Sequence, residues 1–551
     1  MTLDSLSPSK WHPLGLSCIA LLLYILYQYY LHPLHRYPGP LLAKFTDYWR
    51  FQDVRSRKSH LSRVALHKKL GPVVRVGPNT LSIADPAYIP KIYGAGQGFV
   101  KSPFYHPFQG WVGDKIGYNL FTTRDAAYHS ALKKPVAAAY SLKAALEFEP
   151  IVDECIEAIV RHLDEYVIKG DKKNKKAWDM AAWMQYYSFD VMALMTWGKA
   201  FGFLERGQDV NGMIKRLDAR LDVISPQTQM PWLDYLLVKN PIVNLFGFRD
   251  RTNAFATFAA KLIQERQQEL PTSITASTAD SKLARRLFID HFLAAQHSHP
   301  ATVDARTVVI YTTTNIMAGS DTVAIALRTV FYMLMRHSAV YARLQAEIDA
   351  AFVAFTKPSS GTTEPSVSNK HHTEHTPFTF PLAATADLPY LTATINEALR
   401  IHPPVGLPLE RVVPGAGLRM HNDSHILPPG TQVSCHAWPM HHLSSTWGAD
   451  PHLFRPERWL RNETGNETTD AYKARLRSMH DSLLSFGAGS RVCMGRHLSM
   501  LQITKLVPSL LLRYRFALVD PEKEWDVVCG WFVRQAGMDV FVERRGEVLA
   551  R

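Results

Sequence analysis

Apolar residues in this chain recur mostly with the spacing of one helix face. Segments 151–167 and 180–197 show this spacing, as does a longer segment at 304–336 that is long enough to cross a whole domain. Short runs rich in β-branched residues, at 73–76 and 80–83, predict strands instead. The chain is therefore expected to be mainly α-helical with a minor β-sheet.

The apolar segment nearest the amino terminus carries no charge. Residues 14–31 contain one internal amide, Gln28, and would form a helix about 27 Å long, close to the thickness of the hydrocarbon core of a bilayer. A cleaved signal peptide is the alternative interpretation. No small-residue cleavage site follows, however, and the tyrosines near the end of the segment are typical of a membrane interface. We therefore expect residues 1–32 to be a retained transmembrane anchor.

Prolines and basic residues follow this segment. The proline-rich stretch 33–40 would end the helix and join it stiffly to one large domain, residues 33–551, in which we find no repeat. Basic residues are more frequent after the span than before it, which predicts a single pass with the main body in the cytosol. The net charge of +13 favours contact with anionic membrane lipids or with an acidic protein partner, whereas no concentrated basic stripe indicates nucleic acid.

The strongest chemical signal is a glycine-rich loop that carries one cysteine. It reads Phe486-Gly-Ala-Gly-Ser-Arg-Val-Cys-Met-Gly495 and precedes an apolar helical pattern, so Cys493 is expected near a helix amino terminus, which favours a thiolate. Gly487 permits a tight turn, Gly495 removes a side chain where the helix approaches, and Phe486 can shield the sulfur. Arg491 can reach an anionic group. The five cysteines form no Cys-x-x-Cys pair, which argues against zinc.

The middle of the long segment 304–336 contains residues that a helix does not favour. Ala318-Gly-Ser-Asp-Thr322 includes a glycine, which costs on the order of 1 kcal/mol in a helix interior, beside other mediocre helix formers. Such a conflict between propensity and fold is typical of functional sites. Ala318 and Thr322 share a helix face, where a small residue leaves room for a flat cofactor and a hydroxyl can donate to it. An ordinary kink with a polar patch is the alternative.

Both motifs resemble those of the cytochrome P-450 family. The loop matches the family pattern Phe-x-x-Gly-x-Arg-x-Cys-x-Gly at every fixed position, and the Ala318-to-Thr322 motif is similar to the one that activates O2. The resemblance implies the P-450 fold and a heme b whose iron is the metal bound axially by Cys493. It places Arg491 at a heme propionate and Ala318 beside the heme. It also implies that Asp321 and Thr322 deliver protons during O2 activation.

The same resemblance assigns roles to residues elsewhere in the chain. Glu397 and Arg400, three positions apart on one helix face, form with Arg458 a trio that the family buries to support the cysteine loop and to retain heme. Arg411 matches a strand arginine that binds a heme propionate. Two residues that would individually be typical of a surface stand where the other propionate contact is expected: His129 and Lys133. The implied lining of the substrate pocket consists of Ala318, Val405, Leu407 and Trp531.

With the anchor, the resemblance implies a membrane-anchored heme-thiolate monooxygenase that inserts one oxygen atom from O2 into an apolar small molecule. The hinge and residues 187–192 resemble fungal microsomal members near the pisatin-demethylase and benzoate-hydroxylase group, which implies secondary-metabolite biosynthesis at the endoplasmic reticulum membrane.

No flavin- or nicotinamide-binding segment is evident, so the electrons of NADPH are expected from a separate NADPH-cytochrome reductase. Its docking face is expected around Cys493, with Lys133, Lys134 and Arg496. Two other functions remain: an oxygen-independent heme-thiolate isomerase or dehydratase, against which the Asp321-Thr322 pair argues, and a non-catalytic heme-binding module.

Overall fold

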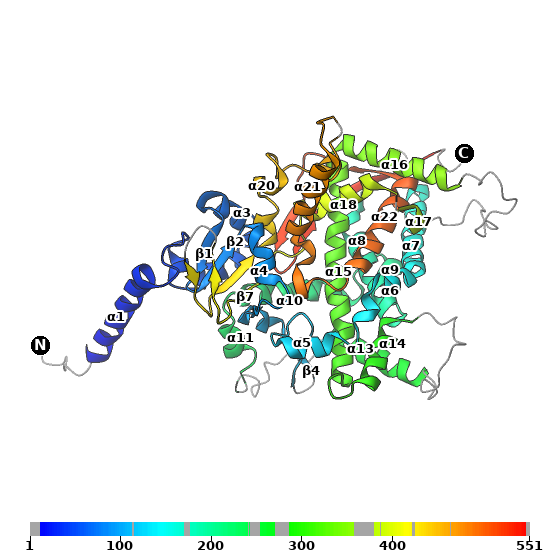
Figure 1. Ribbon diagram of the computed structural model, residues 1–551. Helices are drawn as coiled ribbons and strands as arrows, with labels where there is room; N and C mark the ends of the chain where they lie inside the picture. Colours follow the sequence, from blue (N-terminus) through cyan, green and yellow to red (C-terminus); the bar gives the residue numbers. More distant parts are fainter. Residues whose placement is uncertain are drawn as a thin grey trace, which may run out of the picture.

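The computed structural model describes residues 11–112, 115–169, 177–240, 242, 254–269, 286–356, 379–385, 387–420, 425–462 and 464–546. Helices fill most of the body, and Figure 1 shows α15 running through it as one long rod. The helices before α15 are α1 (Trp11–Leu26), α2 (Tyr48–Arg55), α3 (Ser59–Leu70), α4 (Ile89–Tyr93), α5 (Ala126–Lys133), α6 (Leu142–Glu147), α7 (Glu149–Lys169), α8 (Met180–Trp197), α9 (Phe203–Arg206), α10 (Met213–Gln227), α11 (Trp232–Leu237), α13 (Ala254–Glu269) and α14 (Phe288–Ser298).

The second half of the chain continues the helical pattern. Its helices are α15 (Ala305–Arg336), α16 (Ser338–Thr356), α17 (Leu382–Thr385), α18 (Pro389–Ile401), α19 (Ala437–Met440), α20 (Ser444–Trp447), α21 (Thr469–Ser482) and α22 (Arg496–Arg513). The prediction of a mainly helical chain is confirmed, and α7, α8 and α15 cover the three segments in which helices were expected.

The centre of the body is the contact between α8 and α15. Apolar residues lie on nearly every side of α8, so the helix is buried almost all round. A Cβ atom at Gly319 of α15 would lie 2.8 Å from Sδ of Met192 on α8, which is closer than carbon and sulfur can approach. Glycine at this position lets α15 pass close to α8, since a larger residue would displace the flexible Met192 side chain, and α15 continues without interruption through it.

Strands form small sheets beside the helices. The largest sheet has the order β1-β2-β10-β7-β3, from β1 (Val73–Gly77), β2 (Thr80–Ile83), β3 (Val100–Lys101), β7 (Arg411–Val412) and β10 (Gln432–Cys435). The first two strands confirm the predicted ones, and only β10 and β2 pair in parallel within this sheet. The remaining strands are β4 (Trp111–Val112), β5 (Lys115–Ile116), β6 (Trp178–Asp179), β8 (Leu418–Arg419), β9 (Ile426–Leu427), β11 (Tyr514–Leu518), β12 (Asp526–Cys529), β13 (Val533–Ala536) and β14 (Asp539–Arg544).

The amino-terminal helix projects from the body at the end that carries β1 and β2 (Figure 1). Leu14–Leu31 is long and apolar enough to cross a membrane by itself, and only 6% of this span is buried, so it is a candidate membrane anchor. Its last turn is a π-helix, Tyr27–Leu31, in which Gln28 alone is buried. The Arg75 guanidinium donates to the side-chain oxygen of Gln28 at 2.7 Å and to its carbonyl at 3.1 Å. The end of the apolar helix is thus fastened to the sheet.

Candidate active site

The cysteine loop is closed by its own backbone. It consists of two short 3₁₀ turns, Leu484–Phe486 and Gly489–Arg491, followed by α22. The N–H of Cys493 donates to the carbonyl of Phe486 at 2.8 Å. Gly487 has a φ of +70° and Gly489 one of +64°, and a Cβ at Gly489 would lie 1.7 Å from the Tyr93 carbonyl oxygen. Only glycine can occupy this position, because both its backbone angle and its packing exclude a side chain.

The Cys493 sulfur is open on one side although protein surrounds it on the others. The residue is exposed, yet desolvation by the surrounding atoms raises the pKa of its thiol. The backbone N–H groups of Gly495 and Arg496 and the positive charge of Arg496 oppose this shift, because they stabilise a thiolate. The predicted position at a helix amino terminus is confirmed, since α22 begins at Arg496. A Cβ at Gly495 would lie 3.9 Å from the sulfur, an ordinary contact, so protein atoms alone do not require glycine there.

Basic side chains from segments far apart in the chain converge near this loop. Lys101 of β3 stands directly opposite Arg411 of β7 in the sheet, and its Nζ donates to the carbonyls of Leu120 and Phe121. Burial, followed by the charges of Arg411 and Arg491, holds the pKa of Lys101 well below its ordinary value. Nη1 of Arg491 is buried and has no partner in the described part of the chain. This cluster of Lys101, Arg411 and Arg491 is suited to an anionic ligand.

Arg411 is oriented by the residues beside it. Its Nη1 donates to the Tyr105 hydroxyl at 3.0 Å and to the Glu410 carbonyl at 2.9 Å. Burial and the nearby Arg411 lower the pKa of Arg491 to about 10, which agrees with two guanidinium groups held close together. The two arginines that the sequence assigned to one role are therefore neighbours in the structure.

His129 and Lys133 lie one turn apart on α5, at the edge of the basic cluster. His129 is buried, and burial together with the charges of Arg491, Lys101 and Lys133 lowers its pKa to about 3. The imidazole is therefore neutral at pH 7 and can act as a hydrogen-bond donor without adding charge. Lys133 is half-buried.

The centre of α15 presents Ala318 and Thr322 on one face, as predicted. Ala318 is exposed, and the Thr322 hydroxyl donates to the Ala318 carbonyl at 2.8 Å. Asp321 turns to a different side of the helix and is almost fully buried against α8. Its Oδ1 accepts from the side-chain amide of Gln185 at 2.8 Å, and its Oδ2 has no partner among the described residues.

The surroundings of Asp321 leave it poised to hold a proton. Burial and then the negative charge of Asp218 raise its pKa to about 7, although Gln185, Arg328 and Arg534 act in the opposite direction. Gln185 is itself fixed, because its oxygen accepts from Arg328 at 2.7 Å. The carboxyl group can therefore exchange a proton near neutral pH.

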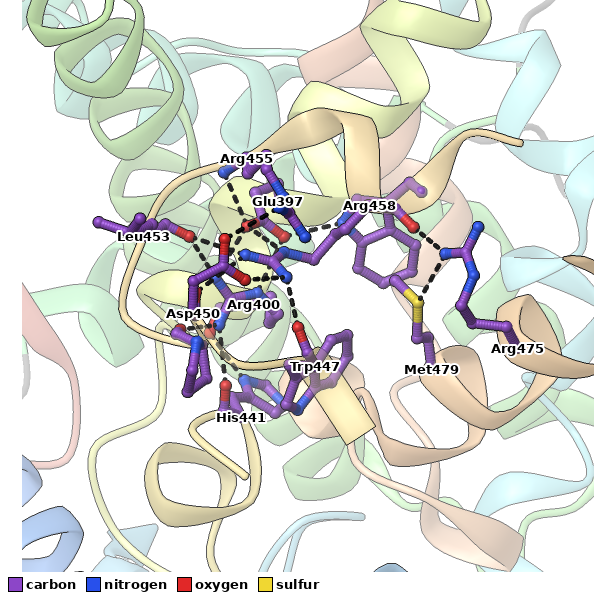
Figure 2. Close-up of polar contacts among 12 residues, drawn as sticks. Glu397, Arg400, His441, Trp447, Asp450, Leu453, Arg455, Arg458, Arg475 and Met479 are labelled. Carbon is purple, nitrogen blue, oxygen red and sulfur yellow. Dashed lines mark hydrogen bonds and ion pairs between the residues drawn. The ribbon is translucent and has the colours of Figure 1, made fainter. Parts of the chain in front are cut away.

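A buried ion network is formed around Glu397 of α18 (Figure 2). Nε and Nη2 of Arg400 donate to the two carboxylate oxygens of Glu397, each at 2.8 Å, and Nε of Arg458 donates to Oε1 at 2.8 Å. The Trp459 indole and the Arg455 backbone N–H each add a bond of 2.9 Å. Burial opposes ionisation of Glu397, but the bonds and charges of Arg400 and Arg458 outweigh it and lower its pKa.

His441 links this network to the cysteine loop. Nη1 of Arg400 donates to the His441 carbonyl at 2.8 Å, and His441 Nδ1 lies 2.9 Å from the Arg400 carbonyl. The N–H of Leu484, the first residue of the loop, donates to Nε2 of the same ring at 2.8 Å. Nε2 must therefore be unprotonated, which places the proton on Nδ1 as the donor to Arg400. A change at Glu397 can thus reach the loop through two residues.

The sequence of this chain matches the cytochrome P450 family over residues 38–539. The chain belongs to the cytochrome P450 family. It is 36% identical over 536 residues to a cytochrome P450 monooxygenase of Aspergillus flavus, covering 97% of this chain and 96% of the relative. The cytochrome P450 monooxygenases cicH and pkfB of Emericella nidulans are 35% and 34% identical, and each comparison covers at least 93% of both chains. The enzyme class is therefore an oxidoreductase of the monooxygenase type.

Membership of the P450 family implies a heme-thiolate cofactor with iron, O2, a small-molecule substrate and a redox partner reductase. The described residues fit such a cofactor. A heme has an iron that binds a thiolate and two carboxylates that need cationic donors. The open side of the Cys493 sulfur suits the first, and the unpaired Nη1 of Arg491 among buried basic groups suits the second.

The predicted substrate lining of this P450 comes together in part. The N–H of Gly406, between Val405 and Leu407, donates to the Trp531 carbonyl at 2.8 Å. The Trp531 ring packs against Phe108 at 4.9 Å and Phe121 at 5.0 Å between ring centroids. These contacts form an aromatic cluster.

Sequence reasoning missed three residues that are partners of the predicted site residues: Lys101, Gln185 and His441. Lys101 stands in a strand of two residues, which shows no periodicity, and its partner Arg411 is more than 300 positions away in the chain. Gln185 is one of several polar residues in α8, which also contains Ser188 and Asp190, so no signal in the sequence distinguished it.

Proposed function

We propose that this P450 is a membrane-anchored monooxygenase that inserts one oxygen atom from O2 into an apolar small molecule of fungal secondary metabolism. The observation that carries the proposal is the combination of the Cys493 loop with the Ala318–Thr322 face and the buried proton-holding Asp321. An oxygen-independent isomerase or dehydratase has no need of such a carboxyl group. The relatives named as monooxygenases support the same class of reaction.

Each residue set has one task in this proposal. Heme bound at Cys493 supplies electron-rich iron for the reductive activation of O2. Lys101, Arg411 and Arg491 bind its two carboxylates, with His129 as a neutral donor and Lys133 at the edge. The Glu397, Arg400 and Arg458 network holds the cysteine loop in place through His441.

Proton delivery is the task of α15. The Thr322 hydroxyl lies on the exposed face and can donate to a reacting oxygen after it leaves the Ala318 carbonyl. Asp321 lies on another side of the helix, so its proton reaches Thr322 through a water molecule or after a side-chain rotation. Val405, Leu407 and Trp531 line the place of the substrate.

The membrane location and the electron-donating partner follow from the anchor and from the reaction. The apolar helix anchors the chain in the endoplasmic reticulum membrane with the body in the cytosol, as basic residues after the span favour. An NADPH-cytochrome reductase supplies electrons at the face formed by Lys133, Lys134 and Arg496. A charge reversal, Lys134→Glu, should slow reduction more at low salt than at high salt, measured by stopped-flow absorbance. Equal rates at both salt concentrations would remove this face from the proposal.

The deciding experiment uses the full chain expressed in yeast membranes. The reduced protein with carbon monoxide is expected to show the red-shifted Soret band of sulfur-ligated heme, and Cys493→Ser should lose that band. With reductase, NADPH and ¹⁸O₂, fungal apolar extracts should yield products that gain one labelled atom. Product formed without reductase would support the isomerase, and ligand-dependent spectra without turnover would support a non-catalytic heme protein.

A further inference from the structure

A cavity of about 510 Å³ lies between α2, α10, α11 and the segment Cys529–Gly530, which directly precedes Trp531. Its volume falls within the range of about 300–1,000 Å³ that ligand pockets occupy. Its inner wall is formed by Ser225 and Gly530, and the N–H of Trp531 donates to the Ser225 hydroxyl at 2.8 Å. The apolar lining comes from α2, α10 and α11: Phe51, Val54, Val223, Pro226, Leu233 and Leu237.

Two arginines stand at the rim of this cavity. Arg55 is exposed and makes no ion pair within the described ranges. Arg57 is paired with Asp222 at 3.2 Å, but its side chain keeps 59% of its surface exposed. Asp222 also accepts from Arg534, so it is shared between two guanidinium groups. The rim thus presents positive charge to solvent above an apolar floor.

The backbone fixes Arg57 at this rim. Its φ is +61°, in the left-handed region that side-chain-bearing residues seldom adopt, and its carbonyl accepts the N–H of Cys529 at 2.9 Å. Cys529 is itself part of the cavity lining. Strain of this kind persists where the surrounding structure holds it, and functional positions are where it is most often found.

Two of the helices that line the cavity also carry exposed apolar side chains. On α11, Trp232 is 55% exposed, Leu236 52% and Leu237 54%, and Val223 on α10 is 61% exposed. Such a patch rimmed by charge is typical of a surface that meets lipid. Figure 1 shows α11 on the side of the body from which α1 projects, so the patch and the candidate span can face one membrane.

We propose that this cavity binds one acyl chain of an anionic phospholipid, with the lipid phosphate at Arg55 and Arg57. Two guanidinium groups can bind a phosphate with charge-assisted hydrogen bonds, and the apolar floor takes the first carbons of the chain. A zwitterionic lipid would bring its own cation to a cationic rim and bind more weakly. The site rests on the membrane location given under the proposed function, and it lies beside the backbone of the predicted substrate lining.

The site can be tested by native mass spectrometry of the full chain in nonionic detergent, titrated with dioleoyl phosphatidylglycerol or dioleoyl phosphatidylcholine. We expect one retained phosphatidylglycerol and much weaker binding of phosphatidylcholine. Replacing both arginines, Arg55→Gln with Arg57→Gln, should weaken phosphatidylglycerol binding by about tenfold or more. Arg477→Gln, at an exposed position on α21, is the matched control and should change nothing.

A second variant tests the apolar floor without touching charge. Leu237→Trp adds bulk at an exposed lining position, so the fold should persist while the acyl chain loses space. A phosphatidylglycerol with a photoreactive diazirine in its acyl chain should crosslink to α10 or α11, mapped by peptide mass spectrometry. Thermal unfolding with and without lipid confirms that each variant is folded.

Several outcomes would overturn the site. Equal binding of the two lipids, an equal loss in Arg477→Gln, or crosslinks elsewhere would each reduce the interaction to a general surface effect. Binding of dodecanoate as tight as that of phosphatidylglycerol, with the same arginine dependence, would make the occupant a carboxylate amphiphile instead. Because these measurements use detergent and no turnover, they remain interpretable if membrane anchoring or monooxygenase activity fails.

Discussion

Glu397 and Asp321 are two carboxylates that the fold removes from water, each on a helix of the core, yet their surroundings differ. Glu397 accepts from two arginines, an indole and a backbone N–H, and its pKa is lowered. Asp321 accepts one bond from a neutral amide, has one unpartnered oxygen, and has a pKa of about 7. The number of cationic donors in contact therefore decides whether a buried carboxylate is a fixed charge or a proton carrier.

Replacing Glu397, the carboxylate that accepts the larger number of hydrogen bonds, should produce the largest effect. Glu397→Ala leaves Arg400 and Arg458 buried without a counter-charge, which costs about 4 kcal/mol of stability and loosens the cysteine loop. Thermal unfolding and the carbon monoxide spectrum measure the two consequences. Glu265→Ala, a half-buried residue in a surface ion pair with Lys199, is the control that should behave like the parent. A Glu397→Ala protein with full stability would show that the network is dispensable.

The two carboxylates should respond to pH with opposite signs. Asp321 holds its proton in the folded chain up to a pH of about 7 but in the unfolded chain only to about 4. Its contribution to the free energy of unfolding therefore declines as pH rises between these values. The decline, about 4 kcal/mol, should be absent in Asp321→Asn. Glu397 has a lowered pKa, so its contribution is present above about pH 4 and is lost as pH falls through its folded pKa.

Urea unfolding from pH 3 to pH 8 measures how the free energy of unfolding depends on pH, and so tests both carboxylates. The difference between the parent and Asp321→Asn should vary from pH 4 to pH 7 and be constant above. The difference between the parent and Glu397→Gln should vary only at the acid end. If the Asp321 difference were constant with pH, the carboxyl group would not be the poised acid described above.

Asp321→Asn should also reduce turnover while leaving the fold and the Soret band intact. The amide can replace the bond to Gln185 but carries no exchangeable acid, so turnover should fall roughly 100-fold. The ratio of product to NADPH consumed, together with the solvent isotope effect, separates slow proton delivery from slow reduction. Ser320→Ala, beside it on α15, serves as the control. An unchanged isotope effect would assign the proton to another group.

The smallest expected effects come from residues that change the pKa of Asp321 but take no direct part in the reaction. Asp218→Asn removes a negative charge and should lower the pKa of Asp321, whereas Gln185→Leu removes a hydrogen bond to the ionised form and should raise it. Each change in proton affinity should be about 1 kcal/mol. The midpoint of the pH–rate profile should move in opposite directions in the two variants, and movement in the same direction would refute this account.

Local patterns predicted the elements of this P450, because they depend on neighbouring residues. The spacing of apolar positions predicted α7, α8 and α15, and the three-residue spacing of Glu397 and Arg400 predicted their shared face. The cysteine loop was predictable because its glycines and Cys493 are close together in the chain. Its backbone angles at Gly487 and Gly489 agree with the expected tight turn.

Contacts between distant segments were not predictable in this way. Lys101 meets Arg411 only because β3 pairs with β7, and His441 reaches Leu484 only because two loops fold together. Asp321 and Thr322 were expected to act together because they are adjacent in sequence. In an α-helix, however, the side chains of consecutive residues point about 100° apart. Tertiary packing against α8 then selected Gln185 as the partner of Asp321.

The bonds from Arg75 to Gln28 bear on how this enzyme can be shortened. Arg75 is completely buried, and two of its hydrogen bonds end on the last turn of the apolar helix. A soluble version cut at the proline hinge would leave Nη1 of Arg75 without its Gln28 acceptor, at a cost of about 1–3 kcal/mol, whereas Nη2 would keep the Pro78 carbonyl at 2.7 Å. A truncation that begins a few residues before Gln28 would keep the two Gln28 acceptors of Arg75 and remove most of the apolar helix.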